Sequence, residues 1–326
     1  MASNKVFVVN ANYAGFFSNW LKILDWIRII EIENHNLNIK VVTNWDGWME
    51  DNQNNVWQSL FQSQNYNSTD KIVGSANTYF ARDKNVIANL HIIIPSIPSI
   101  ISTYCNYFFG VSTVYHDPEF NLLRQKYHEA YKKLSCTPKI NEYVKNIRIK
   151  YELDEQITWL GVHIRSPFYY KMNLKISEKD FVTRIVNDIQ DTMKLTKSNG
   201  LFIATQYEPM LDAIKCSFCD DIRIVYIDTY RTQKNIDWVI SRKENNISIL
   251  NEVIDVWTDV QLLSKCQHVL GGSSNVFFAT LIINPNVPFT LFNTLKNVNH
   301  STKQKAVIND HTKKAVINGQ KKKNSY

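Results

Sequence analysis

Two segments of the sequence combine residue types that could hold a phosphate group. The first is Gly161-Val-His-Ile-Arg165, in which an apolar run ends in a histidine and an arginine. An arginine offers a planar fork of donors that matches phosphate oxygens. The same pattern is also typical of a structural ion pair at the end of a strand, so both readings stay open at this point.

The second segment ends in Gly271-Gly-Ser-Ser-Asn275. Backbone amides at the start of a helix favour an anion, and glycine lets the chain approach it closely. Ser273, Ser274 and Asn275 add side-chain donors. Capping of a helix would also explain these residues, and capping does not exclude anion binding.

The elements that must position these segments alternate between strands and helices. Thr205-Gln206 ends one predicted strand, as Arg165 follows another. The alternation is typical of doubly wound parallel sheets, in which ligands bind beyond the carboxyl ends of the strands. Strands are predicted at residues 5–9, 38–43, 158–163, 201–204, 222–227 and 268–270. Helices are predicted from Ser18, at 117–134, 139–150, 177–195, 208–217 and 248–266, and from Val276. Ser18 and Ser177 are the expected caps of their helices, and Pro138 stands at a helix start, where proline is tolerated.

The positive charge of the chain lies in its last residues. Residues 301–326 hold seven of the 37 basic residues and one of the 30 acidic residues, which leaves the other 300 residues nearly neutral. This distribution argues against a specific nucleic-acid partner. The basic tail is interpreted as a mobile terminus or as an electrostatic contact with an anionic surface.

The cysteines and the apolar runs indicate the cellular compartment in which the protein is expected. Five cysteines, an odd number with a single C-x-x-C at Cys216 and Cys219, favour reduced thiols. The longest apolar run, residues 92–101, is broken by Pro95 and Pro98 and is too short to span a bilayer. No signal peptide is visible. These features predict a cytoplasmic protein without a transmembrane segment.

The order of the motifs resembles the superfamily of nodulation, core α-1,6- and protein O-fucosyltransferases. Its members carry a Gly-Val-His-x-Arg strand, a strand ending in Ala-Thr-Asp, a Leu-Leu-Ser-x-Cys helix and a Ser-Ser-Asn turn. The chain has these motifs in the same order, as Gly161-Val-His-Ile-Arg165, Ala204-Thr-Gln206, Leu262-Leu-Ser-Lys-Cys266 and Ser273-Ser-Asn275. Gly15-Phe-Phe-Ser18 looks like the family's N-terminal glycine loop, and Asn44-Trp-Asp-Gly-Trp48 resembles an early segment of small bacterial members.

The resemblance implies an α/β fold of the GT-B type, with two Rossmann-like doubly wound domains facing across a cleft. Residues 1–150 would form the acceptor-side domain, residues 151–300 the nucleotide-sugar-binding domain and residues 301–326 the basic tail. The implied activity is an inverting glycosyltransferase without a metal or other cofactor. It would move fucose or a related sugar from a GDP-sugar to a glycan, a protein or another hydroxyl acceptor.

Site residues are carried over by position. Arg165 would hold the pyrophosphate and stabilise the leaving GDP, and Asp259 would accept hydrogen bonds from the guanine edge, because a carboxylate suits two adjacent N–H donors. The phosphate cradle and the remaining lining of the nucleotide pocket would come from His163, Thr205, Ser273, Ser274 and Asn275.

The acceptor side is predicted more coarsely. Gly15, Phe16 and Trp48 would lie at the cleft, and Asp46 is the candidate for the base that activates the acceptor. A solvated loop acid is the competing interpretation of Asp46.

The sequence also departs from the family pattern. The family often has Arg-Gly-Thr-Asp after the first strand and an aspartate after Ala-Thr, whereas this chain has Arg165-Ser-Pro and Gln206. Two alternatives therefore remain. One is a catalytically inactive GT-B protein that binds a nucleotide or glycan, and the other is a glycosyltransferase that uses a UDP- or dTDP-sugar.

Overall fold

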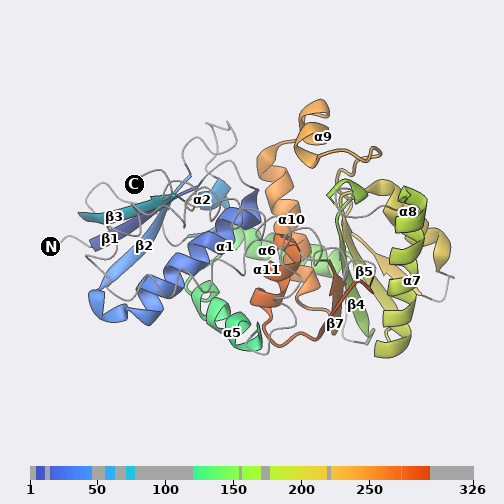
Figure 1. Cartoon of the computed structure of the whole chain (residues 1–326), viewed down its shortest axis with the longest axis horizontal. Coiled ribbons are helices and arrows are strands. Elements are labelled where there is room, and N and C mark those ends of the chain that lie inside the picture. The colour runs from blue at the N-terminus through green and yellow to red at the C-terminus, as the bar shows by residue number, and fades with distance from the viewer. Residues whose placement is uncertain are drawn as a thin grey trace, which may run out of the picture.

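The structure is a computed structural model, and it describes residues 5–11, 15–45, 56–62, 71–77, 120–153, 156–169, 177–218, 222–272 and 274–293. Within them the chain forms two parallel β-sheets, one from each half of the sequence, with helices between them (Figure 1). The predicted α/β class is confirmed. Asp46, Trp48, Ser273 and the basic tail lie outside the described residues.

The N-terminal sheet has three parallel strands in the order β2-β1-β3. Its elements are β1 (Lys5–Asn10), α1 (Phe16–Ile27), a π-helix η1 (Arg28–Glu33), a 3-10 turn η2 (His35–Leu37), β2 (Ile39–Asn44), α2 (Val56–Leu60) and β3 (Lys71–Asn77). The apolar run Val6–Val9 makes β1 the buried central strand. After η2 the chain turns at Asn38, whose φ of 51° is left-handed, and enters β2.

Two helices connect the sheets. They are α5 (Phe120–Tyr131) and α6 (Pro138–Lys150). The hydroxyl of Thr137 accepts a hydrogen bond from the Ile140 amide, and Pro138 occupies the first helical position. Proline is tolerated there because the first amides of a helix have no intrahelical acceptor.

The C-terminal sheet has five strands in the order β6-β5-β4-β7-β8, and all its pairs are parallel. The strands are β4 (Trp159–Ile164), β5 (Gly200–Thr205), β6 (Arg223–Val225), β7 (His268–Gly271) and β8 (Phe289–Leu291). The helical elements are η5 (Pro167–Tyr169), α7 (Glu178–Thr196), α8 (Glu208–Ser217), α9 (Trp238–Glu244), α10 (Ile249–Leu263) and α11 (Asn275–Ile283). The strand order reverses at β4, and such a reversal opens a crevice at the carboxyl end of the sheet.

Both faces of the C-terminal sheet are buried, so this half is doubly wound as predicted. Leu160 and Val162 of β4 pack in one apolar cluster with α7 and α8. Trp159 and Phe202 point to the opposite face and belong to a larger cluster that includes α1, α5, α10 and α11 and reaches Phe7 of β1. One apolar core thus runs between the two sheets, and the predicted division into domains at residue 150 stays a prediction.

Gly161 has a packing reason. A side chain at this position of β4 would meet Cys266 Sγ at 2.9 Å and a Leu263 methyl at 3.0 Å. The glycine therefore lets the strand approach the end of α10 closely. Two motifs that are 100 residues apart are joined here by direct packing.

Helix starts were predicted with mixed success. Ser177 caps α7 as expected, with its hydroxyl 3.1 Å from the Asp180 amide. The expected cap by Ser18 is wrong, because α1 begins at Phe16 with Gly15 before it. Ser18 lies in the first turn, and its amide donates to the Gly15 carbonyl at 3.0 Å. No described helix is both long and apolar enough to cross a membrane.

Arg124 of α5 fastens the C-terminal end of α11. It is 3% exposed and donates to the carbonyl oxygens of Leu281 at 3.2 Å, Asn284 at 3.1 Å and Val287 at 2.9 Å. Burial lowers the pKa of Arg124 to about 10. Leu281 and Asn284 belong to the end of α11, where the last carbonyls lack intrahelical donors, and Val287 follows in the next loop.

We expect Arg124→Ala to destabilise the protein by about 2–4 kcal/mol, because the substitution leaves buried carbonyl oxygens without their hydrogen-bond donor and opens a cavity. The measurement is chemical or thermal unfolding. Gln125→Ala is the matched control, since Gln125 reaches Asn286 from the same helix in an exposed position. Its effect should stay within about 0.5 kcal/mol, and equal losses in both variants would contradict this role of Arg124.

Candidate active site

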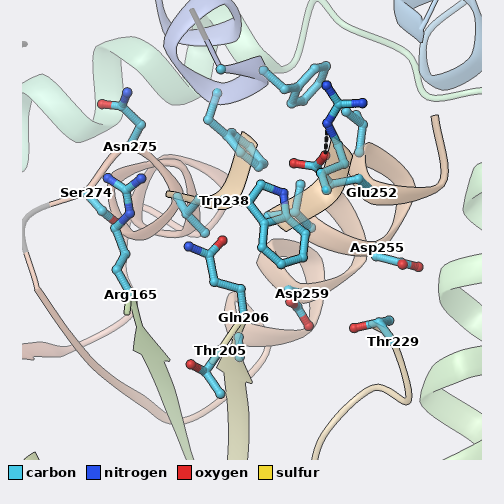
Figure 2. A pocket seen from close by; sticks show the side chains of 18 of the residues that line it. Arg165, Thr205, Gln206, Thr229, Trp238, Glu252, Asp255, Asp259, Ser274 and Asn275 are labelled. Atoms are coloured by element: carbon cyan, nitrogen blue, oxygen red, sulfur yellow. Dashed lines mark ion pairs between the residues drawn. The ribbon is translucent and has the colours of Figure 1, made fainter. Parts of the chain in front are cut away.

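A cavity of about 400 Å³ lies beyond the carboxyl ends of β4 and β5. Its walls come from the start of α1, the loop that follows β6, α9, one face of α10 and the start of α11 (Figure 2). This is the position that the strand order predicts for a ligand site. Eight of the predicted site residues line it, namely Gly15, Phe16, His163, Arg165, Thr205, Asp259, Ser274 and Asn275. The other three, Asp46, Trp48 and Ser273, fall outside the described residues.

Arg165 stands at one end of the cavity, directly after β4. Figure 2 shows its side chain on the same side of the cavity as those of Ser274 and Asn275. Its carbon lies 3.6 Å from the centre of the Tyr169 ring. To the described residues the guanidinium makes no hydrogen bond or ion pair, so the ion-pair reading of Arg165 finds no carboxylate there. Its N–H groups can therefore serve a ligand.

His163 joins β4 to the start of α11. It is buried, and its Nδ1 lies 3.3 Å from the Ser274 hydroxyl oxygen. Burial, with the charge of Arg165 adding to it, lowers the pKa of His163 to about 3. The imidazole is therefore neutral near pH 7, and the positive charge beside it belongs to Arg165.

Ser274 is the cap of α11. Its hydroxyl accepts a hydrogen bond from the Phe277 amide at 3.1 Å. The capping role considered from the sequence is thus confirmed. Since the first amides of a helix have no intrahelical acceptors and carry the positive end of its dipole, this end of the cavity favours an anion.

Three acids of α10 face the cavity. Glu252, Asp255 and Asp259 are spaced by three and four residues and therefore share one face of the helix. Burial raises the pKa of Asp259 to about 8, with Arg231 opposing the rise and Asp255 adding to it. Burial raises the pKa of Asp255 to about 6, against the effect of Arg231.

Helix α9, which forms one wall of the cavity, was not predicted from the sequence. Its first residue, Trp238, projects into the middle of the cavity in Figure 2, and its ring centre lies 5.6 Å from that of Tyr230. A side-chain hydrogen bond joins Trp238 to Glu252, whose carboxylate lies 3.4 Å from Arg242. Asp237 caps this helix through the Val239 amide at 2.8 Å, and that aspartate was the one local signal of a helix start.

Gln206 follows β5 and lines the cavity near Thr205 (Figure 2). It occupies the position where the fucosyltransferase pattern has an aspartate. Its neutral amide adds no charge between the cationic and acidic ends. The described residues also contain no group of three or more His, Cys, Asp or Glu side chains arranged to hold one metal ion.

The cavity is therefore polarised. One end offers Arg165 and the amides of α11 to an anion. The other end offers the carboxylate of Asp259 to hydrogen-bond donors, and the Trp238 ring lies between the two ends. A ligand with a phosphate group at one end and a hydrogen-bonding heterocycle at the other matches this arrangement.

Comparison with known proteins identifies solved structures that have a similar fold. No protein-family model matches the sequence, and no curated protein is detectably similar to it. Among solved structures, the chain resembles the NodZ alpha-1,6-fucosyltransferase soaked with GDP-fucose, with 14% identity over 90% of this chain and 97% of that chain and a TM-score of 0.51.

Two further structures score slightly lower. The fucosyltransferase NodZ from Bradyrhizobium is 13% identical over 87% of this chain and 94% of its own, with a TM-score of 0.49. POFUT1 in complex with GDP is 12% identical over 88% of this chain and 98% of its own, with a TM-score of 0.44. At this identity the likeness concerns the fold, which the chain shares with the NodZ structure soaked with GDP-fucose.

Proposed function

We propose that the protein is a glycosyltransferase that transfers fucose, or a closely related sugar, from a GDP-sugar to a hydroxyl acceptor. The observation that carries the proposal is the polarised cavity, with an arginine free for phosphate at one end and a half-buried aspartate at the other. The solved NodZ structure with this fold was soaked with GDP-fucose, which agrees with the proposal.

The diphosphate of the donor would lie against Arg165 and the first turn of α11. As the bond from the sugar carbon to the phosphate oxygen breaks, negative charge grows on GDP. Fixed donors aimed at that charge lower the barrier. The acceptor oxygen forms the new bond to the sugar carbon from the opposite side, and its proton passes to a base. For that base Asp46 remains the prediction from the sequence.

The base of the nucleotide would meet Asp259. The guanine edge presents two adjacent N–H donors, and a carboxylate can accept both. Uracil presents one N–H between two carbonyl oxygens, and those oxygens would face the carboxylate unfavourably. Buried polar groups that lose their partners make such discrimination strong. The site therefore favours GDP over UDP or dTDP.

A nucleotide-binding protein without transfer activity is the second candidate. The observation in its favour is Gln206, a neutral amide that lines the cavity where the family pattern has an acid. Binding of GDP without cleavage of any GDP-sugar would support this candidate against the first.

The direct test is cleavage of the donor. Purified protein should release GDP from GDP-fucose faster than it releases UDP from UDP-glucose. Activity should persist in EDTA, because the proposed phosphate site consists of an arginine, a hydroxyl and amides. Loss of activity in EDTA that manganese restores would contradict the metal-free mechanism. Faster cleavage of UDP-glucose would contradict the choice of donor.

A further inference from the structure

The guanidinium of Arg165 is held by an aromatic ring. It lies on the face of the Tyr169 ring, 3.6 Å from the ring centre to the guanidinium carbon. No carboxylate among the described residues pairs with it. Among the described residues, the aromatic ring is therefore the contact that fixes the direction of this side chain.

An arginine can be held in place by the face of an aromatic ring or by a carboxylate, and the two differ in how many of its N–H groups stay available to a ligand. A carboxylate would occupy part of the donor fork and neutralise its charge. A ring face attracts the cation through its quadrupole and leaves the N–H groups in the guanidinium plane available. Tyr169 can thus orient Arg165 without competing for the phosphate oxygens.

Tyr169 is itself fixed from several sides. Its hydroxyl oxygen accepts a hydrogen bond from the Trp238 amide at 3.1 Å, which ties η5 to the first residue of α9. Its own amide donates to the Ser166 carbonyl at 3.2 Å, and its ring meets the Phe168 ring edge-on at 5.4 Å between centres. The ring therefore connects the phosphate end of the cavity to the α9 wall.

We propose that Tyr169 is the positioning residue for Arg165, holding the guanidinium in the plane that receives the donor's diphosphate. This inference rests on the proposed function, because it assigns Arg165 to the diphosphate. It also gives a physical meaning to the Arg165-Ser-Pro-Phe-Tyr169 segment, which replaces the acidic pattern of the fucosyltransferases. Tyr169 acts through Arg165 and need not touch the donor.

The test is a double-mutant cycle with two probes, inorganic pyrophosphate and GDP, each titrated by calorimetry. Tyr169→Leu should weaken binding of both probes about tenfold, because the ring face is lost. Tyr169→Phe keeps the ring and should cost about two- to threefold. In the Arg165→Ala background, Tyr169→Leu should change binding less than about twofold, because a residue that acts through Arg165 has no partner left there.

Leu195→Ala is the control. It removes an exposed side chain of α7 that lies outside the cavity lining, and binding of both probes should stay within about twofold of the unchanged protein. A Tyr169→Leu protein that binds both probes normally would overturn the inference. An equal loss with and without Arg165 would also overturn it, because Tyr169 would then act on the cavity wall.

A ligand-free measurement covers the case in which Tyr169→Leu does not fold. The side-chain N–H signal of Arg165, assigned by its loss in Arg165→Lys, should be shifted upfield by the ring current and should remain so in Tyr169→Phe. An unshifted signal would overturn the stacking. Failure of the proposed function has a different signature, since UDP would then match GDP while the pyrophosphate cycle kept its result.

Discussion

Arg165→Ala should lower the rate of donor cleavage about 10²–10³-fold. Its effect on GDP affinity should be smaller, because one charge-assisted contact in the bound state is worth about 1.5–3 kcal/mol. The difference arises because Arg165 faces the charge that grows as the sugar leaves. Comparison of kcat with the dissociation constant of GDP measures it.

Two further variants sharpen this test. Arg165→Lys should recover only part of the rate, since a point charge cannot reproduce the planar fork. Arg184→Ala, on the exposed side of α7, removes an arginine that does not line the cavity and should leave the rate unchanged. If Arg165→Ala unfolds the protein, the residue is a structural partner of the strand end. If it folds and cleaves the donor normally, the site lies elsewhere and the assigned roles of His163 and Ser274 fail with it.

Asp259→Asn should weaken GDP binding about 100-fold, because the amide presents a donor to the guanine edge and removes the charge from the hydrogen bonds. The unchanged protein should also bind GDP more tightly as the pH rises towards about 8. Asp259, with a pKa of about 8, is protonated below that value and must lose its proton to accept both guanine N–H groups. This pH dependence should disappear in Asp259→Asn, and calorimetry across the pH range measures both effects.

The same substitution should stabilise the ligand-free protein. The pKa of Asp259 is raised from 3.8 to about 8 on folding, so between these values the folded state binds more protons than the unfolded state. Stability contributed by this group is therefore lost as the pH rises through that window. Asp259→Asn removes the loss and should raise Tm by about 2–4 °C at pH 8, the shift expected for about 1 kcal/mol.

The control for Asp259 is Asp191→Asn, an exposed acid of α7 that should change neither GDP affinity nor Tm measurably. A lower Tm in Asp259→Asn would show that the carboxylate has a structural partner. Unchanged GDP affinity would remove Asp259 from the base site.

The sequence predicted those parts of the site that follow buried strands. Arg165 directly follows β4 and Thr205 ends β5, and parallel pairing brings such ends to one edge of a sheet. Ser274 could be predicted as a site residue for the same reason, since it lies between β7 and α11. The apolar runs of these strands and the helix signals at Ser177 and Pro138 are local features, and local features can be read without the fold.

The other parts depend on contacts between distant residues. Trp238 and Glu252 are recognised as site residues only in the structure, where α9 and α10 lie at the ends of the strands. The stacking of Arg165 on Tyr169 depends on the short η5 turn, which has no periodic pattern. In the sequence Arg124 looks like an ordinary helix arginine, because its partners, at the end of α11 and just beyond it, lie more than 150 residues away. The prediction of Ser18 as a helix cap was wrong for a different reason. The helix begins at Phe16, directly after Gly15, two residues before Ser18.

The central claim is that the cavity is a site for a GDP-sugar, and a calorimetric titration of GDP, UDP and dTDP into the unchanged protein at one pH tests it most directly. The account predicts that GDP binds with one-to-one stoichiometry and at least about tenfold more tightly than UDP or dTDP, because only guanine offers Asp259 two adjacent donors. Binding of UDP or dTDP as tight as that of GDP would contradict the account.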